Sequence, residues 1–214
     1  MTYSVKEIYY TLQGEGAQTG RPAVFLRFAG CNLWSGREVH RAEAVCRFCD
    51  TEFVGTDGPG GGKFETASEL AEAVSRAWPQ ASVDTGRYVV CTGGEPLLQL
   101  DAVAIDALHD AGFEVGVESN GTLCAPSGID WLCISPKGKA PVVQTSGNEL
   151  KLVYPQVEAE AQPAAFGRME FEHFFLQPLD SPERETNTQS AIRYCLTHPQ
   201  WKLSLQTHKI IGID

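Results

Sequence analysis

Three cysteines lie close together in the chain with the spacing of a metal-binding loop. Fourteen residues separate Cys31 from Cys46, two separate Cys46 from Cys49, and Asp50 and Thr51 follow directly. Thiolate sulfur is the ligand that zinc, copper(I) and iron–sulfur clusters prefer. Three thiolates leave one position of a four-coordinate site open. The sequence therefore predicts a soft-metal site, and the rest of the chain has to identify the metal.

Polar segments follow four of the predicted strands at the points where those strands end. They are 92–96 (TGGEP), 118–121 (ESNG), 135–137 (SPK) and 177–180 (QPLD). In parallel α/β folds, ligands bind at the carboxyl ends of the strands. Each segment alone is more simply interpreted as a turn, because Gly, Ser, Asn and Pro are common turn residues. Four such segments together with the cysteines favour a binding site along this edge.

The segment at 93–96, Gly-Gly-Glu-Pro, has the residue types of a ligand-binding turn. Two glycines let a ligand approach the backbone closely, and their amides can meet a carboxylate. Glu95 offers an acceptor for an ammonium group, and Pro96 suits the first turn of a following helix. The turn therefore favours the amino-acid end of a zwitterionic ligand.

The elements that must position these residues alternate between strands and helices. Strands are predicted at 4–12, 22–28, 87–92, 113–119, 131–137, 148–154, 169–180 and 201–214, helices at 66–78, 97–112 and 184–198, and a short helix near 38–45. This alternation indicates βαβ units and a parallel sheet. The segments 121–130 and 155–168 lack a helical pattern, and 55–62 is typical of a flexible Gly-rich connector. The expected fold is α/β, an incomplete, trimmed (β/α)6-type partial TIM barrel with a mostly parallel sheet, in one domain over 1–214.

The composition limits the class of partner. A formal net charge of −10 over 214 residues argues against a nucleic-acid partner, whose binding surface should be basic. No apolar run reaches the roughly 20 residues of a membrane-spanning helix, and the N-terminus has no secretory pattern. Seven mostly scattered cysteines indicate reduced thiols in a cytoplasmic protein rather than a disulfide framework. A trimmed barrel leaves apolar edges, which predicts a homodimer.

The motifs resemble those of the radical S-adenosylmethionine enzymes. The resemblance lies in the three cysteines after the second predicted strand, in Phe48 between the last two of them, and in Gly-Gly-Glu-Pro at 93–96. It implies that the cysteines, in a loop of about 29–51, hold three irons of a [4Fe–4S] cluster, while the fourth iron takes S-adenosylmethionine. One electron from the cluster would then release a 5′-deoxyadenosyl radical, so the cofactors carry the difficult step.

The fourteen-residue gap departs from the usual C-x3-C-x2-C spacing of that superfamily. An enlarged loop, with YTLQGEG, FLRFAGCNLW, CDT, TGGEP, ESNG, SPK, LQPLD and QTHKIIGI, is similar to the 7-carboxy-7-deazaguanine synthases over nearly the whole chain. The resemblance implies a lyase that converts 6-carboxy-5,6,7,8-tetrahydropterin to 7-carboxy-7-deazaguanine with loss of ammonia, in 7-deazapurine (queuosine) biosynthesis. The implied partners are the pterin and an electron donor such as flavodoxin or ferredoxin.

The same resemblance implies roles for individual residues. The S-adenosylmethionine site would comprise Phe48, Cys49, Asp50, Gly94, Glu95, Ser119, Ser135, Pro136, Lys137, Gln177, Pro178, Leu179 and Asp180. The substrate would contact Leu12, Gln13, Gly14, Glu15, Arg27, Thr92, Glu118 and the terminal carboxylate of Asp214. Thr51 would place a Mg²⁺ ion against the substrate. Arg27 interrupts an apolar strand, and its guanidinium fork matches a carboxylate, although a structural Asp or Glu is an equal alternative.

Two other functions remain open on the sequence. Cys31, Cys46, Cys49 and His40 could form a closed Cys3His zinc site, which would have a structural role only. A radical enzyme that activates a protein partner by forming a glycyl radical is the second alternative. His208 lies in the terminal motif QTHKIIGI and is expected near the site.

Overall fold

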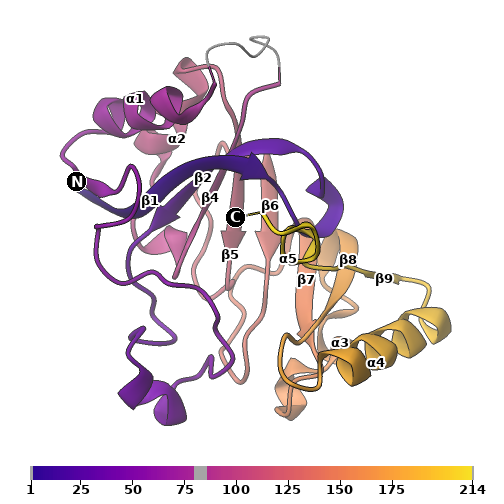
Figure 1. Cartoon of the computed structure of the whole chain (residues 1–214). Helices are drawn as coiled ribbons and strands as arrows, with labels where there is room; N and C mark the ends of the chain where they lie inside the picture. Colours follow the sequence, from indigo (N-terminus) through magenta and orange to yellow (C-terminus); the bar gives the residue numbers. More distant parts are fainter. Residues whose placement is uncertain (1, 80–85, 214) are drawn as a thin grey trace.

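The sheet follows chain order across most of its width. A computed structural model describes residues 2–79 and 86–213. Its strands form one sheet in the order β3-β1-β2-β4-β5-β6-β7-β8-β9, drawn in Figure 1. The strands are β1 (Tyr3–Leu12), β2 (Pro22–Phe28), β3 (Gly62–Phe64), β4 (Tyr88–Gly93), β5 (Glu114–Ser119), β6 (Trp131–Ile134), β7 (Ser146–Tyr154), β8 (Glu170–Pro178) and β9 (Trp201–Leu203).

Most neighbouring strands are parallel. β1 pairs antiparallel with β2 and β3, whereas the pairs from β2 to β9 are all parallel. β3 and β9 form the two edges, so the sheet is open. The strands β2 and β4 to β8 make up the six-stranded parallel part, to which the short β9 is added. The prediction of an α/β fold with a mostly parallel, incomplete barrel is confirmed.

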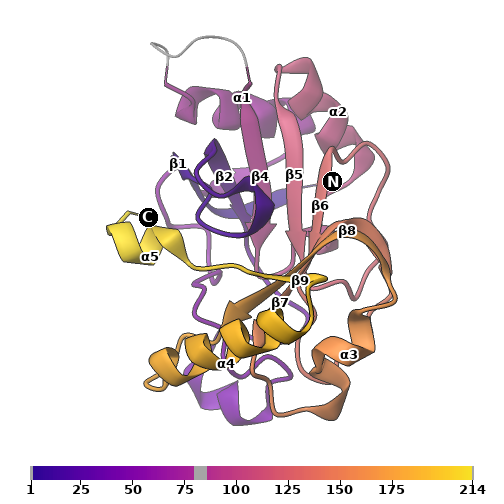
Figure 2. The same ribbon diagram turned by 90° about the vertical axis from the view of Figure 1, so that its right-hand side faces the viewer.

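The helices lie in two groups. α1 (Ala67–Ala77) and α2 (Ala102–Asp110) pack together against β1 and β5, while α4 (Arg184–Thr197) packs against β8 and β9, as Figures 1 and 2 show. Thr66 and Glu69 form a reciprocal capping box at the start of α1, which satisfies two backbone donors. The other helices are short: η1 (Gly16–Gln18), η2 (Glu38–Glu43), η3 (Pro96–Leu98), η4 (Ala159–Ala161), α3 (Pro163–Phe166) and α5 (Thr207–Ile211). None of the described helices combines the length and apolarity needed to cross a bilayer.

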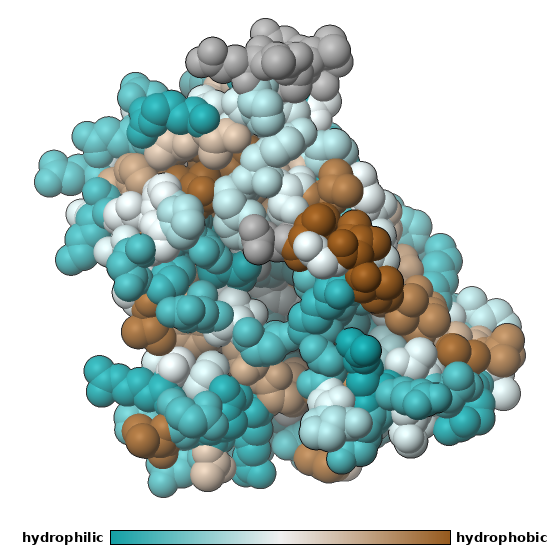
Figure 3. Space-filling view, in the orientation of Figure 1, coloured by the Kyte–Doolittle hydropathy of each residue, from teal (hydrophilic) through white to brown (hydrophobic). Residues whose placement is uncertain are grey.

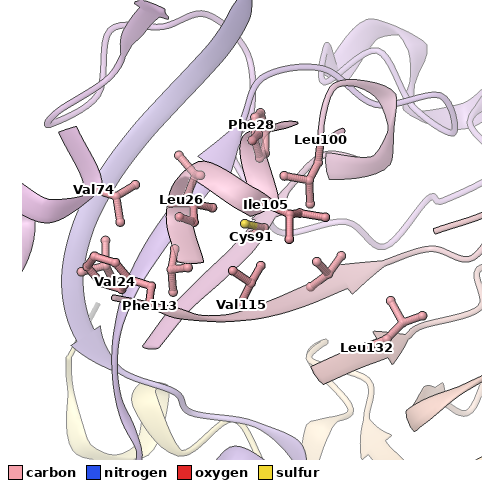
Figure 4. Packing of buried hydrophobic residues seen from close by; sticks show 14 of the residues in the cluster. Val24, Leu26, Phe28, Val74, Cys91, Leu100, Ile105, Phe113, Val115 and Leu132 are labelled. Atoms are coloured by element: carbon pink, nitrogen blue, oxygen red, sulfur yellow. The ribbon is translucent and has the colours of Figure 1, made fainter. Parts of the chain in front are cut away.

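One face of the strands forms the hydrophobic core. Figure 4 shows side chains of β2, β4, β5 and β6 gathered with Val74 of α1 and Ile105 of α2; the labelled strand residues are Val24, Leu26, Phe28, Cys91, Val115 and Leu132. Because side chains alternate along a strand, the residues between them face the other way. Arg27 and Thr92, which are register partners, and Glu118 therefore lie on the opposite face. That face carries the candidate site.

The prediction of a single helix over 97–112 is wrong. The chain forms η3, leaves the helical conformation and starts α2 at Ala102. The Gln99 side chain bonds the sheet instead: it accepts from Ser4 N of β1 at 2.7 Å and donates to O of Ala29, the residue after β2, at 2.8 Å. Asp101 then caps α2 by accepting from Ala104 N at 2.9 Å. A side-chain bond to the sheet therefore interrupts an apolar helical pattern.

The predicted last strand with a short tail over 201–214 is confirmed only for its first residues. β9 ends at Leu203, and α5 follows. The Thr207 hydroxyl and backbone N–H both donate to Gly14 O, at 2.7 and 2.9 Å, which fixes α5 on the loop after β1. Gly212, at a φ of 71°, ends the helix in the left-handed conformation that glycine favours.

The Gly-rich segment 55–62 is bound to the sheet rather than free. Gly58 N donates to Lys6 O at 2.9 Å, and Ile8 N donates to Pro59 O at 2.7 Å. β3 then pairs with Tyr3–Val5 of β1. The glycines permit this close backbone approach, so the expected flexible connector forms an edge of the sheet. The cysteine loop before it is thereby held at both ends.

Candidate active site

A cavity of about 400 Å³ lies at the carboxyl ends of the parallel strands. This volume falls within the range of small-molecule sites. Most residues that the sequence assigns to the site line it: Leu12, Gln13, Gly14, Glu15, Arg27, Cys31, Cys46, Phe48, Cys49, Asp50, Thr51, Thr92, Gly94, Glu118, Ser119, Ser135, Lys137, Gln177, Pro178, Leu179 and Asp180. Segments from across the whole chain therefore meet in one hollow.

Two of the described residues assigned to the site have other locations. Glu95 and Pro136 are not among the described residues that line the cavity. Both are buried, and the Glu95 side chain has 0% exposure. The terminal Asp214 lies outside the described residues.

The three cysteines of the loop are free thiols that line the cavity together. Leu33 N donates to Cys31 Sγ at 3.4 Å. Trp34, Ala44 and Phe53 form an apolar cluster against which Cys31 and Cys49 pack. Hydrogen bonds to sulfur and restricted solvent access are the means by which proteins adjust iron–sulfur clusters. The donor set and its surroundings thus fit a cluster held by three cysteines.

Cys46 and Cys49 are close enough to share a proton. The hydrogen bond between their side chains lowers the pKa of Cys49 to about 6 and raises that of Cys46 well above its ordinary value. Lys137 favours the thiolate form of both through its charge. Burial raises the pKa of Cys31. The contact thus favours the thiolate form of Cys49, and thiolate is the form that binds metals.

His40 does not complete a zinc tetrahedron with these cysteines. It belongs to the exposed η2, and its Nδ1 lies 2.9 Å from Ser35 Oγ. Within the described residues, no group of three His, Cys, Asp or Glu side chains could hold a single metal ion. A cluster differs in this respect, because its cysteines bind separate irons. The arrangement favours a cluster over the Cys3His alternative.

The turn at 93–96 fits closely against the start of the cysteine loop. A Cβ at Gly94 would overlap Gly30 O and the Cys31 side chain, so only glycine fits there. Glu95 N donates to Gly30 O at 3.0 Å. The Glu95 carboxylate accepts from Leu97 N at 3.0 Å, from Ser119 Oγ at 2.8 Å and from Asn120 N at 2.7 Å. Glu95 therefore connects the ends of β4 and β5, and burial raises its pKa despite these bonds.

Arg27 is paired within the protein. Its Nε donates to Glu7 Oε1 at 2.7 Å, and its Nη2 donates to Tyr9 Oη at 2.8 Å. Burial opposes the charge of Arg27, but Tyr9 and Glu7 outweigh it and raise the pKa. The structural carboxylate that the sequence left open is thus Glu7 of β1. All three side chains line the cavity.

Lys151 of β7 joins two acidic residues of the site. Its Nζ lies 2.8 Å from Glu15 Oε2 and 3.1 Å from Glu118 Oε2. Gln13 Nε2 donates to Glu118 Oε1 at 2.7 Å. Burial alone would raise the pKa of Glu15, but the charge of Lys151 outweighs it and lowers that pKa to about 2. The lowered pKa favours the ionised form of Glu15, and these contacts hold both carboxylates in position.

Lys209 of α5 crosses from one side of the cavity to the other. Its Nζ lies 2.6 Å from Asp50 Oδ2 and 2.7 Å from Asp180 Oδ2. Asp50 follows the last cysteine, whereas Asp180 follows β8. Hydrogen bonding to Lys209 lowers the pKa of Asp180. The C-terminal helix is thereby tied to both rims, and His208 lines the cavity as expected.

Sequence reasoning missed several residues that line the cavity. The most important are Glu7, Tyr9, Lys151 and Lys209. Lys151 could have been found, because it interrupts the apolar run of β7 as Arg27 interrupts that of β2. Glu7 and Tyr9 alternate along β1 and share its face, but nothing in the sequence marks that face as the polar one.

Comparison with known proteins identifies the family. A protein of Caulobacter vibrioides named 7-carboxy-7-deazaguanine synthase is 64% identical over 213 residues, and the match covers 100% of both chains. The chain belongs to the 7-carboxy-7-deazaguanine synthase family. Proteins of the same name from Bordetella pertussis and Nitratidesulfovibrio vulgaris are 64% and 53% identical, again over 100% of both chains.

A solved structure agrees with this family membership. The crystal structure of QueE from Escherichia coli superposes with a TM-score of 0.71 at 28% identity, covering 97% of this chain and 95% of that one. No protein-family model matches the chain. The family therefore rests on full-length relatives and on a shared fold.

Proposed function

We propose that the protein converts 6-carboxy-5,6,7,8-tetrahydropterin to 7-carboxy-7-deazaguanine with loss of ammonia, a step towards 7-deazapurines such as queuosine. Substrate and product differ by the elements of ammonia, so the conversion is redox-neutral overall. The observation that carries the proposal is the joint lining of one cavity by Cys31, Cys46, Cys49 and Arg27. The chain is 64% identical to a protein named for this product.

A [4Fe–4S] cluster held by the three cysteines, with S-adenosylmethionine bound beside it, supplies the one-electron chemistry when both are present. Phe48, Asp50, Gly94, Ser119 and Lys137 are the nearest residues for the S-adenosylmethionine. The segment 177–180 extends that site along the end of β8. The methionine end lies near Gly94, which lines the cavity directly beside Cys31.

The substrate lies on the opposite side of the cavity. The backbone of 12–14 and the carboxylates of Glu15 and Glu118 accept hydrogen bonds from the pterin edge. Arg27 receives the substrate carboxylate with its remaining donors, beside its register partner Thr92. Thr51 holds a Mg²⁺ ion together with substrate oxygens and water, the ligands that this ion prefers.

The same proposal includes the cellular location of the enzyme, its electron donor and its oligomeric state. Free cysteines support a reducing, cytoplasmic location, where flavodoxin or ferredoxin supplies electrons. Figure 3 shows hydrophobic surface right of its centre, over α5. Ile210 and Ile211 of that helix are 65% and 59% exposed. Contiguous apolar surface of this kind marks protein contacts, which supports a homodimer.

The test is anaerobic reconstitution followed by incubation with the carboxy-tetrahydropterin, S-adenosylmethionine and a reductant. We expect about four irons per chain and 7-carboxy-7-deazaguanine as product. Cys46→Ala should lose both iron and product, whereas His40→Ala should keep both. A colourless protein with one zinc, or an iron-loaded protein without this product, would overturn the proposal.

A further inference from the structure

The acidic wall of the cavity depends on one buried cation. The Lys151 side chain is 4% exposed, and its Nζ contacts Glu15 and Glu118. These carboxylates come from distant parts of the chain, the loop after β1 and the end of β5. Burial lowers the pKa of Lys151, but the charges of Glu118 and Glu15 outweigh it and raise the pKa well above its ordinary value. Lys151 is therefore a permanent charge between two acids.

The remaining oxygens of both carboxylates also accept hydrogen bonds. Glu15 Oε1 accepts from Gln206 Nε2 at 3.1 Å, and Glu118 Oε1 accepts from Gln13 Nε2 at 2.7 Å. A carboxylate oxygen has two lone pairs, so each retains acceptor capacity after these bonds. The carboxylates are thus fixed in orientation and still able to receive donors from a ligand.

Other titratable groups surround this cluster. Glu149, two residues before Lys151 on β7, is 2% exposed and accepts from Ala17 N at 3.0 Å. Burial raises the pKa of Glu149 and that of its neighbour Cys133 on β6. Tyr88 of β4 faces Glu118, and His208 of α5 faces Glu15.

Without Lys151, this pocket would bring two acids together with no buried cation beside them. Like charges in a buried site cannot both stay ionised easily, and one takes up a proton. A protonated carboxyl presents a donor where the pterin edge also presents donors. Binding would then be lost even though every group that touches the ligand is still present.

We propose that Lys151 is a positioning residue that fixes Glu15 and Glu118 as paired acceptors for the amino and ring N–H groups of the substrate. Lys151 acts through the two carboxylates rather than on the reacting atoms. The inference rests on the proposed function, because a pterin supplies those N–H donors. Lys151 therefore affects the binding of the N–H edge of the substrate, which lies opposite the substrate carboxylate.

The experiment compares kcat/KM of the reconstituted holoenzyme and of Lys151→Met from about pH 5.5 to about pH 8.5. At neutral pH we expect KM for the pterin to rise about 10- to 100-fold in the variant. The ratio of variant to wild type should fall further as the pH decreases, because Glu15 becomes protonated in the variant. Lys202→Met, in β9, is the matched control and should give a ratio near one at every pH.

A second substitution separates positioning from stability. Glu118→Gln in the Lys151→Met background removes the like charge beside Glu15. The decrease of kcat/KM at acidic pH, here called the acid limb, should then move to lower pH. Glu118→Gln alone keeps the Lys151–Glu15 pair, so it should fold and raise KM without creating an acid limb. Lys151→Met with a pH-independent loss, or a double variant with the profile of the single one, would overturn the inference.

The outcomes distinguish this inference from the function on which it rests. If wild-type holoenzyme does not form 7-carboxy-7-deazaguanine, the proposed function fails. If wild type forms it and the ratio for Lys151→Met does not depend on pH, only the role of Lys151 fails. Should Lys151→Met be insoluble, the inference is decided by Glu118→Gln, for which an acid limb or an unchanged KM contradicts it.

Discussion

Arg27 Nε donates a 2.7 Å hydrogen bond to Glu7 Oε1, and both side chains line the cavity. The pair is mostly shielded from water, with side-chain exposures of 16% for Arg27 and 25% for Glu7. In the proposed function, the substrate carboxylate approaches a guanidinium that already has an anionic partner. Glu7 therefore stabilises the substrate-free protein and reduces the binding free energy that Arg27 can contribute when the ligand carboxylate arrives.

Glu7→Gln should separate these two effects. Glutamine keeps an amide oxygen that can still accept from Arg27 Nε, but it removes the negative charge that balances this largely buried guanidinium, so the melting temperature of the substrate-free protein should fall. Substrate then supplies the missing anion, and the temperature increase on binding should exceed that of wild type. Thermal unfolding with and without the carboxylated pterin measures both quantities. An equal increase in the two proteins would show that Arg27 does not receive the carboxylate.

Lys209→Met should weaken cofactor binding with little loss of stability. The bridges of Lys209 to Asp50 and Asp180 are partly exposed, and such pairs contribute about 0.2–1 kcal/mol to folding. Their loss frees the two rims of the proposed S-adenosylmethionine site. We expect KM for S-adenosylmethionine to rise several-fold while the melting temperature changes little. Lys63→Met in β3 is the control, and equal KM values in both variants would contradict this role.

Glu95→Gln should destabilise the protein although Glu95 does not line the cavity. The carboxylate accepts three hydrogen bonds, and an amide nitrogen cannot accept. One buried donor is then left unsatisfied, at a cost of about 1–3 kcal/mol. Denaturant unfolding measures the change, with the exposed Glu65→Gln as control. A stability equal to that of the control would contradict the connection between β4 and β5.

The Lys151–Glu15 pair predicts a specific loss of stability in acid. The pKa of Glu15 is lowered to about 2 in the folded protein from an ordinary 4.5. Its contribution is therefore complete above pH 4.5 and decreases as the pH falls through that interval. Glu15→Gln should remove this part of the pH dependence, which unfolding of the apoprotein between these pH values would show. Parallel curves for variant and wild type would contradict it.

Much of the site could be predicted from the sequence because its residues follow recognisable strands. Cys31 follows β2, Gly94 follows β4 and Ser119 ends β5, and chain order places these ends side by side. The inward Arg27 was also recognisable, since a charge within an apolar strand needs a partner. The mostly parallel sheet and the cysteine loop could thus be predicted from the sequence.

The rest depended on contacts between distant segments. The hydrogen bonds of the Glu95 carboxylate to Ser119 and Asn120 join two strand ends that are far apart in the sequence, so only the fold reveals them. The helix expected at 97–112 is interrupted by the bond of Gln99 to β1, and α5 forms because Thr207 bonds Gly14. The role of Lys151 depends on its contacts with Glu15 and Glu118, which are far away in the sequence.

The most direct test follows one hydrogen atom. Substrate deuterated at the carbon that bears the carboxylate is incubated anaerobically with holoenzyme, S-adenosylmethionine and reductant, and the nucleoside product is analysed by mass spectrometry. Deuterium in 5′-deoxyadenosine together with formation of 7-carboxy-7-deazaguanine is the predicted result. Unlabelled 5′-deoxyadenosine, or label transfer without the deazaguanine, would contradict the proposed reaction.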